Sequence, residues 1–260
     1  MFISVLELFK IGIGPSSSHT MGPMVAAREF VDRVRESYAM HQLTQATHIH
    51  CILKGSLAFT GRGHATDRAV ALGLHGYTPE SVADDDVDAV VARIWNEDSI
   101  AVDDSHAVLF SPSKHIIFDQ CESLPEHPNG MIFKWILESG EVLLSETYFS
   151  IGGGFISTLA ELKQVVAPLK MNSAASCPHP FDTAESMLHM SADTGLSIAA
   201  MKCINERQFL SDDVLNHGLD SIWQAMQRCI ESGLMAEGVL PGGLVLARRS
   251  KRLHEQLQAN

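Results

Sequence analysis

Small hydroxyl side chains and one imidazole are concentrated in the segment GIGPSSSHTMGPM, residues 12–24. Its polar members are Ser16, Ser17, Ser18, His19 and Thr20. An apolar run with helical spacing follows, and the first turn of a helix offers unpaired backbone N–H groups and a partial positive charge that attract carboxylates and phosphates. The segment therefore predicts an anion-binding cradle, with an ordinary N-cap surrounded by redundant serines as the alternative.

The imidazole of His19 favours the cradle, because helix capping needs no imidazole, whereas acid–base chemistry beside a bound anion uses one. A second segment, TGRGHATD at residues 60–67, again sets a histidine, His64, among glycines at a helix start. We expect the two loops to face one pocket. Asp67 would either cap its helix or orient His64 by accepting from the ring N–H.

Three consecutive glycines, residues 152–154, follow a predicted strand. They permit positive φ angles and close backbone approach, so they would either form the floor of the same pocket or act as a hinge between domains. The chain has neither the G-x-G-x-x-G spacing of a dinucleotide fold nor the lysine of a P-loop. It also lacks the G-x-S-x-G motif of a serine hydrolase, so a hydrolase acting through Ser16 to Ser18 is the weakest hypothesis.

Metal-binding patterns are weak in this sequence. His48 and His50 share one face of a predicted strand, but no third ligand follows at a suitable spacing, so we expect satisfied or exposed side chains. The five cysteines are scattered and contain no C-x-x-C pair, which predicts free thiols in a reducing cytoplasm. We assign no metal ligand on this chain.

Composition excludes several classes of protein. The chain has 260 residues, 45% of them hydrophobic and 19% charged, as in ordinary globular proteins. Its net charge of −12 argues against a nucleic-acid or acidic-membrane partner. The opening 14 residues are apolar but include Glu7 and Lys10 and are too short to span a bilayer, so they predict a buried first segment.

Hydrophobic periodicity predicts the elements that carry the two loops. Residues 21–36 have helical spacing, residues 47–53 alternate as in a strand, a helix is expected from Thr66 to about Gly73 or Gly76, and residues 131–150 predict a β-hairpin. The acidic segment 79–104 predicts an exposed helix or loop rather than a cation site. These elements predict a mixed α/β domain with an antiparallel-rich sheet.

The pattern changes near residues 158–170, after which helices are favoured. Residues 213–234 predict an amphipathic helix whose apolar face we expect to be core. That face carries Leu215, Leu219, Ile222, Trp223, Met226 and Ile230. Since so few helices cannot close a core, we expect this region to need further chain or a partner. The predicted fold is α+β, with a mixed domain at residues 1–157 and an incomplete all-helical domain at 171–260.

Five motifs together resemble one known family. In order, they are KIGIGPSSSHTMGPM (residues 10–24), GSLAFTGRGHATD (55–67), HPNGM (127–131), YFSIGGGFI (148–156) and EGVLPGGL (237–244). The chain resembles the bacterial iron-sulfur L-serine dehydratases, also called L-serine ammonia-lyases, over nearly its whole length. The first region would be their β domain, and the second would be the start of their helical α domain.

The resemblance implies β-elimination of water from L-serine, giving aminoacrylate and then pyruvate and ammonia, in a cytoplasmic catabolic or gluconeogenic role. It implies a [4Fe-4S] cluster whose open iron acts as a Lewis acid on the hydroxyl group. His19 and His64 would be the catalytic base and proton handler, in an order that the sequence leaves open. Ser16, Ser17, Ser18 and Thr20 would bind the substrate carboxylate, and Asp67 would orient or bind the amino group.

This chain departs from the family at its end, because the family's cluster-binding cysteines lie beyond the last motif. None of the five cysteines here has a matching context. We therefore expect a fragment, a truncated product or half of a split enzyme, inactive without the remaining α-domain portion in cis or trans, and a homodimer in the complete enzyme. The alternative is a non-enzymatic regulatory module that binds L-serine.

Overall fold

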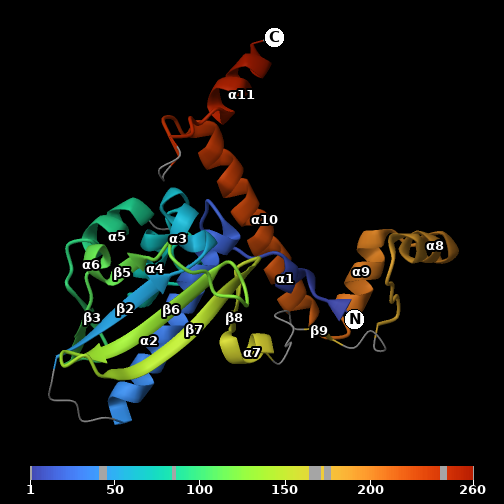
Figure 1. Cartoon of the computed structure of the whole chain (residues 1–260). Helices are drawn as coiled ribbons and strands as arrows, with labels where there is room; N and C mark the ends of the chain where they lie inside the picture. Colours follow the sequence, from blue (N-terminus) through green and yellow to red (C-terminus); the bar gives the residue numbers. More distant parts are fainter. Residues whose placement is uncertain are drawn as a thin grey trace. The chain divides into compact units, whose positions relative to one another are not determined.

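A computed structural model describes residues 2–40, 46–83, 86–163, 171–172, 177–240 and 245–259 (Figure 1). The chain forms two compact units. The sheet unit comprises residues 11–168 and 237–248, and the helical unit comprises residues 1–10, 169–236 and 249–260. The opening residues thus group with the helices rather than with the sheet, and the region of the predicted boundary at 164–170 lies outside the described residues.

The sheet unit contains a seven-stranded mixed sheet, so the α+β prediction is confirmed. Its main order is β3-β4-β2-β6-β7-β8, and β5 also pairs with β2. Strands β4 and β5 run parallel to β2, whereas the other pairs are antiparallel. The bounds are β2 Thr47–Leu53, β3 Ser99–Ala101, β4 Ala107–Leu109, β5 Ile116–Phe118, β6 Gly130–Leu137, β7 Val142–Gly152 and β8 Phe155–Thr158.

Alternation along β2 sets the two faces of the sheet, as predicted. Ile49, Cys51 and Leu53 are fully buried, while the residues between them are half-buried. The hairpin prediction is also confirmed, because β6 and β7 pair from Gly130 with Phe149 onward. The turn between them contains Gly140 at φ 91°, a conformation that glycine adopts without strain.

Two helices cover the buried face. Helix α2, Gly22–Met40, runs along the sheet behind β6 and β7 in Figure 1, and α4, Thr66–Leu74, packs against it. The predicted apolar positions of α2 are all in the core, at Met24, Ala27, Val31 and Val34. Phe30 of α2 stacks on Phe133 of β6 with ring centroids 5.2 Å apart, which ties helix to sheet.

Short helical segments occupy the connections of the sheet unit. They are η1 Ser17–Met21, α3 Ser56–Thr60, η2 Gly61–His64, α5 Val87–Ile94, α6 Pro112–His115 and α7 Leu159–Lys163. Helix α5 lies in the acidic segment that predicted an exposed helix or loop, yet it buries Val91 and Ile94. Part of the acidic run, residues 84–85, lies outside the described residues.

The helical unit holds the opening residues through specific contacts. Strand β1, Phe2–Ile3, pairs antiparallel with β9, Met171–Asn172, and the backbone N–H of Val5 donates to the buried Glu206 carboxylate at 2.7 Å. The prediction of a buried first segment is right only for Phe2, because Leu8 and Phe9 are 63% and 46% exposed. The remaining elements are α1 Val5–Leu8, α8 Ala184–Thr194, α9 Ile198–Glu206, α10 Asp212–Met235 and α11 Ser250–Gln258.

Helix α10 confirms the predicted helix but not its burial. Of the face expected to be core, Leu215 is buried, whereas Trp223, Met226 and Ile230 are 57%, 41% and 58% exposed. The sequence pattern describes a face made for burial, and the described residues do not cover it. No helix in the described ranges has both the length and the apolar character needed to cross a bilayer.

Close packing of α2 on α4 gives a first prediction. A Cβ atom on Gly73 would clash with the Met24 carbonyl oxygen and would lie 2.8 Å from the Cβ of Ala27. We expect Gly73→Ala to lower the free energy of unfolding, measured by urea titration, by about 1–3 kcal/mol, as overpacking does.

The matched control is Gly233→Ala, because Gly233 lies within α10 with open space around it. Alanine there should leave stability unchanged or raise it by up to about 1 kcal/mol through helix propensity. Equal stability of the Gly73→Ala and wild-type proteins would contradict the close approach.

Candidate functional site

The serine-rich segment forms a short π-helical turn that leads into α2. Ser16 is the N-cap of η1, with its Oγ accepting from the backbone N–H of His19 at 3.2 Å. The N-cap alternative is therefore right for this one serine. Ser18 Oγ lies 2.9 Å from His19 Nδ1, so a second serine holds the ring.

The second loop presents His64 from the end of η2. Its Nδ1 lies 2.9 Å from the carbonyl oxygen of Thr60. Since a carbonyl oxygen only accepts, Nδ1 carries the hydrogen, and in the neutral ring Nε2 bears the lone pair. Ala65 follows in the left-handed conformation, at φ 54°, and turns the chain into α4.

The two histidines lie together, as the sequence predicts. Their ring centroids are 4.8 Å apart, with the planes tilted by 42°. Two reciprocal hydrogen bonds join the loops: Thr20 Oγ1 donates to the carbonyl oxygen of His64 at 2.9 Å, and Thr66 Oγ1 donates to that of His19 at 2.5 Å. Both threonines are buried, so water does not compete for these bonds.

Burial and the neighbouring ring set the charge of His19. Partial burial is the larger cause, and proximity to His64 the smaller, of a His19 pKa below the ordinary histidine value. Both effects disfavour the imidazolium, so His19 is neutral near pH 7. Its Nε2 lies 2.9 Å from Ser56 Oγ. Ring and hydroxyl each donate or accept, so these contacts allow either tautomer.

The hydroxyl groups of the cradle differ in what they contact. Ser17 is exposed on the turn beside His19, which leaves it open to a ligand. Thr20 is 1% exposed, and its hydroxyl accepts from the Ser16 backbone N–H and donates to His64. Thr20 thus connects the two loops in this structure. Sequence reasoning assigned no role to Ser56, although it lies within the quoted motif GSLAFTGRGHATD.

Asp67 is not the cap of its helix. Ala65 occupies the N-cap position of α4 without a side-chain hydrogen bond, and Asp67 lies one residue inside the helix. Its Oδ1 accepts from the backbone N–H of Arg68 at 3.0 Å. The ring N–H of His64 is directed to Thr60 instead, so orientation of His64 by Asp67 is not the arrangement seen here.

The glycine turn lies next to the cradle. Gly152, Gly153 and Gly154 all have positive φ angles, between 62° and 97°. A Cβ on Gly154 would lie 3.2 Å from the methyl group of Met21, the last residue of η1. Gly154 therefore packs against η1, and the pocket-floor and hinge interpretations of the three glycines both stay predictions.

Outside this site, the structure brings a third histidine to His48 and His50. His115 directly precedes β5, and its ring centroid lies 4.9 Å from that of His50 and 5.9 Å from that of His48. The long-range pairing of β5 with β2 creates this cluster, so local spacing could not reveal it. Within the described ranges, no three His, Cys, Asp or Glu side chains are arranged to hold a metal ion.

The structure thus places two neighbouring imidazoles beside a serine-rich helical turn. The chain belongs to the serine dehydratase beta chain family, whose model matches residues 4–161. This finding confirms the family resemblance.

Curated relatives extend the match over the whole chain. L-serine dehydratase TdcG of Escherichia coli is 42% identical over 257 residues, which make up 98% of this chain and 54% of that protein. L-serine dehydratase of Streptomyces coelicolor is 38% identical over 260 residues, covering 100% of this chain and 56% of the relative. The chain thus spans about half the length of the curated relatives it matches.

Ring proximity predicts a measurable coupling between the two histidines. We expect an NMR titration to give His19 a pKa below the ordinary value of about 6.5. His64→Gln should raise that pKa, because a neighbouring positive charge is removed, but not fully restore it, because burial is the larger cause. His106→Gln is the matched control and should leave the pKa of His19 unchanged. A His19 pKa at the ordinary value in the wild-type protein would contradict the burial of His19 beside His64.

Proposed function

We propose that the chain is the β-chain portion of an L-serine ammonia-lyase, which eliminates water from L-serine to give pyruvate and ammonia. The family membership supports the reaction class, and the curated relatives carry the name L-serine dehydratase. The observation that carries the proposal is the pair of imidazoles 4.8 Å apart beside an exposed serine turn. Removal of an α-proton needs a base at such a position.

In this proposal the substrate carboxylate binds at the N-terminal turn formed by η1. The Ser17 hydroxyl is the foremost donor, since it is exposed, and Ser16 and Ser18 shape the turn around it. Unpaired backbone N–H groups of a first turn add donors and a partial positive charge. Thr20 positions His64, and Asp67 is available to the amino group.

We assign the base to Nε2 of His64. Its Nδ1–H is fixed on Thr60, so the lone pair on Nε2 is free to take the Cα proton of L-serine. His19 is bonded to serine hydroxyls at both nitrogens, which suits a group that holds the substrate or passes a proton through Ser56. The structure thus supports an order for the two histidines that the sequence leaves open.

The residues of this chain do not fit an iron-sulfur cluster. Cys51 is fully buried in the core, where desolvation raises its thiol pKa far above the ordinary range, and Cys177 is buried as well. Cys121 lies in the loop between β5 and β6, Cys203 lies in α9 and Cys229 lies in α10. The [4Fe-4S] cluster that the family resemblance implies, and with it the activation of the leaving hydroxyl, would belong to the remaining α-domain portion, in cis or in trans.

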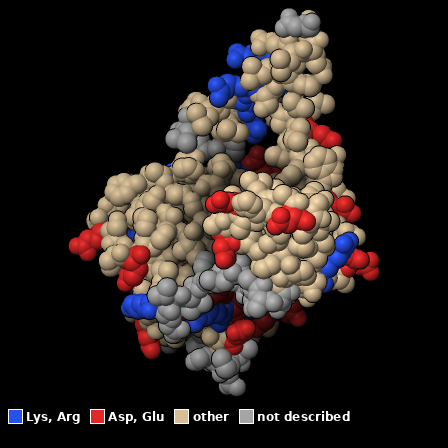
Figure 2. Space-filling view, turned by 90° about the vertical axis from the view of Figure 1, so that its right-hand side faces the viewer, with Lys and Arg blue, Asp and Glu red and all other residues tan. Residues whose placement is uncertain are grey.

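The exposed apolar face of α10 supports the proposal that the second domain is incomplete. Apolar side chains such as Trp223 and Ile230 are more than half exposed there. On the face drawn in Figure 2, uncharged residues predominate and charged side chains are scattered among them. We propose residues 1–157 as the β domain and 171–260 as the first part of the α domain, within a cytoplasmic homodimer.

Activity should require the missing portion. We expect the chain alone to form no pyruvate from L-serine, and anaerobic co-expression with the part of E. coli TdcG beyond the matched residues to restore pyruvate formation. His64→Gln should then lower kcat by about 100-fold or more, as loss of a general base does. His106→Gln, in an exposed loop, is the control. Full activity of His64→Gln, or turnover by the chain alone, would contradict this account.

Substrate binding can be tested on the chain by itself. Calorimetry with L-serine should show binding that Ser17→Ala weakens about tenfold, since a hydrogen bond to a charged group is worth about 1.5–3 kcal/mol. Ser113→Ala, at an exposed serine of α6, should have no effect. If neither Ser17→Ala nor His19→Ala changes the affinity for L-serine, the result would favour the regulatory module, which would then bind L-serine at another site.

A further inference from the structure

Residues 2–9, the opening segment, belong to the helical unit by their contacts, although the sheet unit follows them directly in the sequence. Strand β1 adds to β9, and α1 packs on α10 (Figure 1). The packing is close, because a Cβ atom on Gly218 of α10 would lie 2.6 Å from Cδ2 of Leu6. Addition of an extended segment to a strand is a common mode of peptide recognition.

Phe2 is the apolar anchor of the opening segment. Its side chain is 6% exposed, and its ring stacks on that of Phe209 with the centroids 5.3 Å apart. The Lys202 ammonium group lies 3.8 Å from the centroid of the Phe2 ring. Stacking and the cation–π contact both add to the free energy gained from burial. Phe2 therefore gives the segment an aromatic contact that only the helical unit provides.

A buried carboxylate binds the backbone of the segment. Glu206 is 1% exposed, and its Oε1 accepts from the Val5 backbone N–H at 2.7 Å and lies 3.2 Å from Lys202 Nζ. Lys202 Nζ also donates to the carbonyl oxygen of Ile3. Among the described residues no donor reaches Glu206 Oε2, so Oε1 makes the polar contacts of this carboxylate. A buried charge that loses a donor is costly, and the segment and α9 thus stabilise each other.

The opening segment reaches these helices by contacts and not by a short connection. Val5 and Glu206 are 201 positions apart, and residues 11–168 between them build the sheet unit. Strand pairing, aromatic stacking and a charged hydrogen bond do not require a covalent link between their two sides. The segment therefore resembles a docked peptide more than a linker.

We propose that the opening segment is the docking element by which the β region binds the helical α region, also when the two regions are separate chains. Its partner is a helical region that begins near residue 169 and supplies β9, α9 and α10. The proposal rests on the division into β and α regions made in the proposed function, but not on the lyase reaction.

Cutting the folded chain between Lys163 and Met171 tests the docking. A recognition sequence for a site-specific protease, inserted there, allows the full-length protein to be cut after folding. We expect the two pieces to elute together in gel filtration at micromolar concentration, and separation of the pieces would overturn the proposal. The assay involves no turnover of L-serine, so failure of docking and failure of the lyase site are distinguishable.

Val5→Pro isolates the hydrogen bond to Glu206. Val5 is the first residue of α1, where proline is tolerated, and Ser4 has the extended backbone, at φ −66° and ψ 145°, that suits a residue before proline. Proline lacks the N–H, so the dissociation constant of the cut pieces should rise at least about tenfold. Val5→Ala keeps the N–H and is the matched control. Equal dissociation constants for these two variants would overturn the proposal.

Phe2→Ala tests the aromatic anchor in the same assay. Loss of the ring should raise the dissociation constant at least about tenfold. The matched control is Phe9→Ala, because Phe9 belongs to the same segment but is 46% exposed. Equal effects of Phe2→Ala and Phe9→Ala would overturn the proposal.

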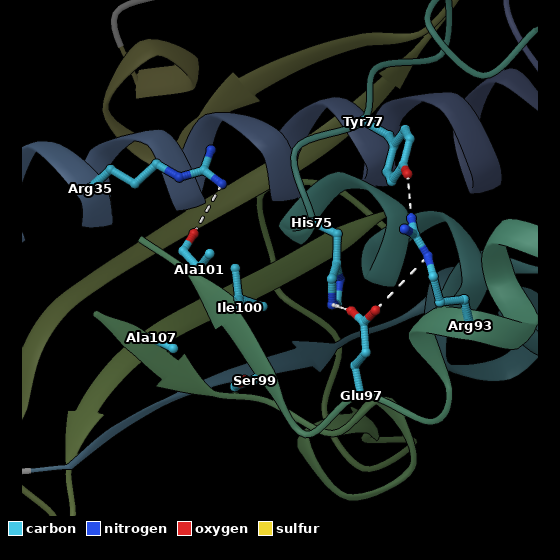
Figure 3. A pocket seen from close by; sticks show the side chains of 9 residues that line it. All are labelled: Arg35, His75, Tyr77, Arg93, Glu97, Ser99, Ile100, Ala101 and Ala107. Carbon is cyan, nitrogen blue, oxygen red and sulfur yellow. Dashed lines mark hydrogen bonds and ion pairs between the residues drawn. The ribbon is translucent and has the colours of Figure 1, made fainter. Parts of the chain in front are cut away.

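Lys202→Gln tests the cation that contacts both the Phe2 ring and the Ile3 carbonyl group, and it should also weaken binding. Arg93→Gln is the control, because Arg93 donates to Tyr77 within a cavity that only residues of the sheet unit line (Figure 3). Binding that is weakened equally by both substitutions, or by neither, would overturn the proposal.

Discussion

Two crossed hydrogen bonds between buried threonines and backbone carbonyls hold the candidate site together. Thr20 donates to His64 and Thr66 donates to His19, so each loop fixes the backbone of the other loop's histidine. Neither threonine hydroxyl is open to solvent, which makes loss of either bond costly. The loops come from distant parts of the chain, and this pair of bonds converts them into one rigid site.

The surrounding fold supports that contact at both ends. Helix α2 begins directly after the turn that contains His19, and α4 begins after the single residue that follows His64. Packing of α2 on α4 therefore brings the two loops to the same end of the helix pair. Gly22 allows this arrangement to rest on the sheet, because a Cβ there would clash with Ser150 of β7. Acid–base geometry in the site therefore depends on core packing beneath it.

Local sequence patterns were sufficient to predict several helices and strands and the two loops that carry His19 and His64. Alternation in residues 47–53 predicted β2, helical spacing predicted α2, and glycine-flanked histidines predicted that His19 and His64 would meet. Each of these predictions depends on contacts between residues that are near in sequence or on a repeated loop type. The assignment of substrate-binding roles to the serines stays a prediction.

The features that sequence analysis missed all depend on long-range pairing. His115 joins His48 and His50 only because β5 pairs with β2 in parallel, and the opening residues join the helical unit through Glu206. Hydrophobic periodicity specifies which side of an element is to be covered but not which partner covers it. Trp223 shows this limit directly, since the pattern marked a core position that the described residues leave exposed.

The central claim is that one site contains both imidazoles, and ring-to-ring nuclear Overhauser effects test it most directly. With centroids 4.8 Å apart, the ring protons of His19 and His64 should give a cross-peak in the wild-type protein. Thr66→Val should weaken that cross-peak, because the valine cannot donate to the His19 carbonyl. A wild-type spectrum without any such cross-peak would contradict the account.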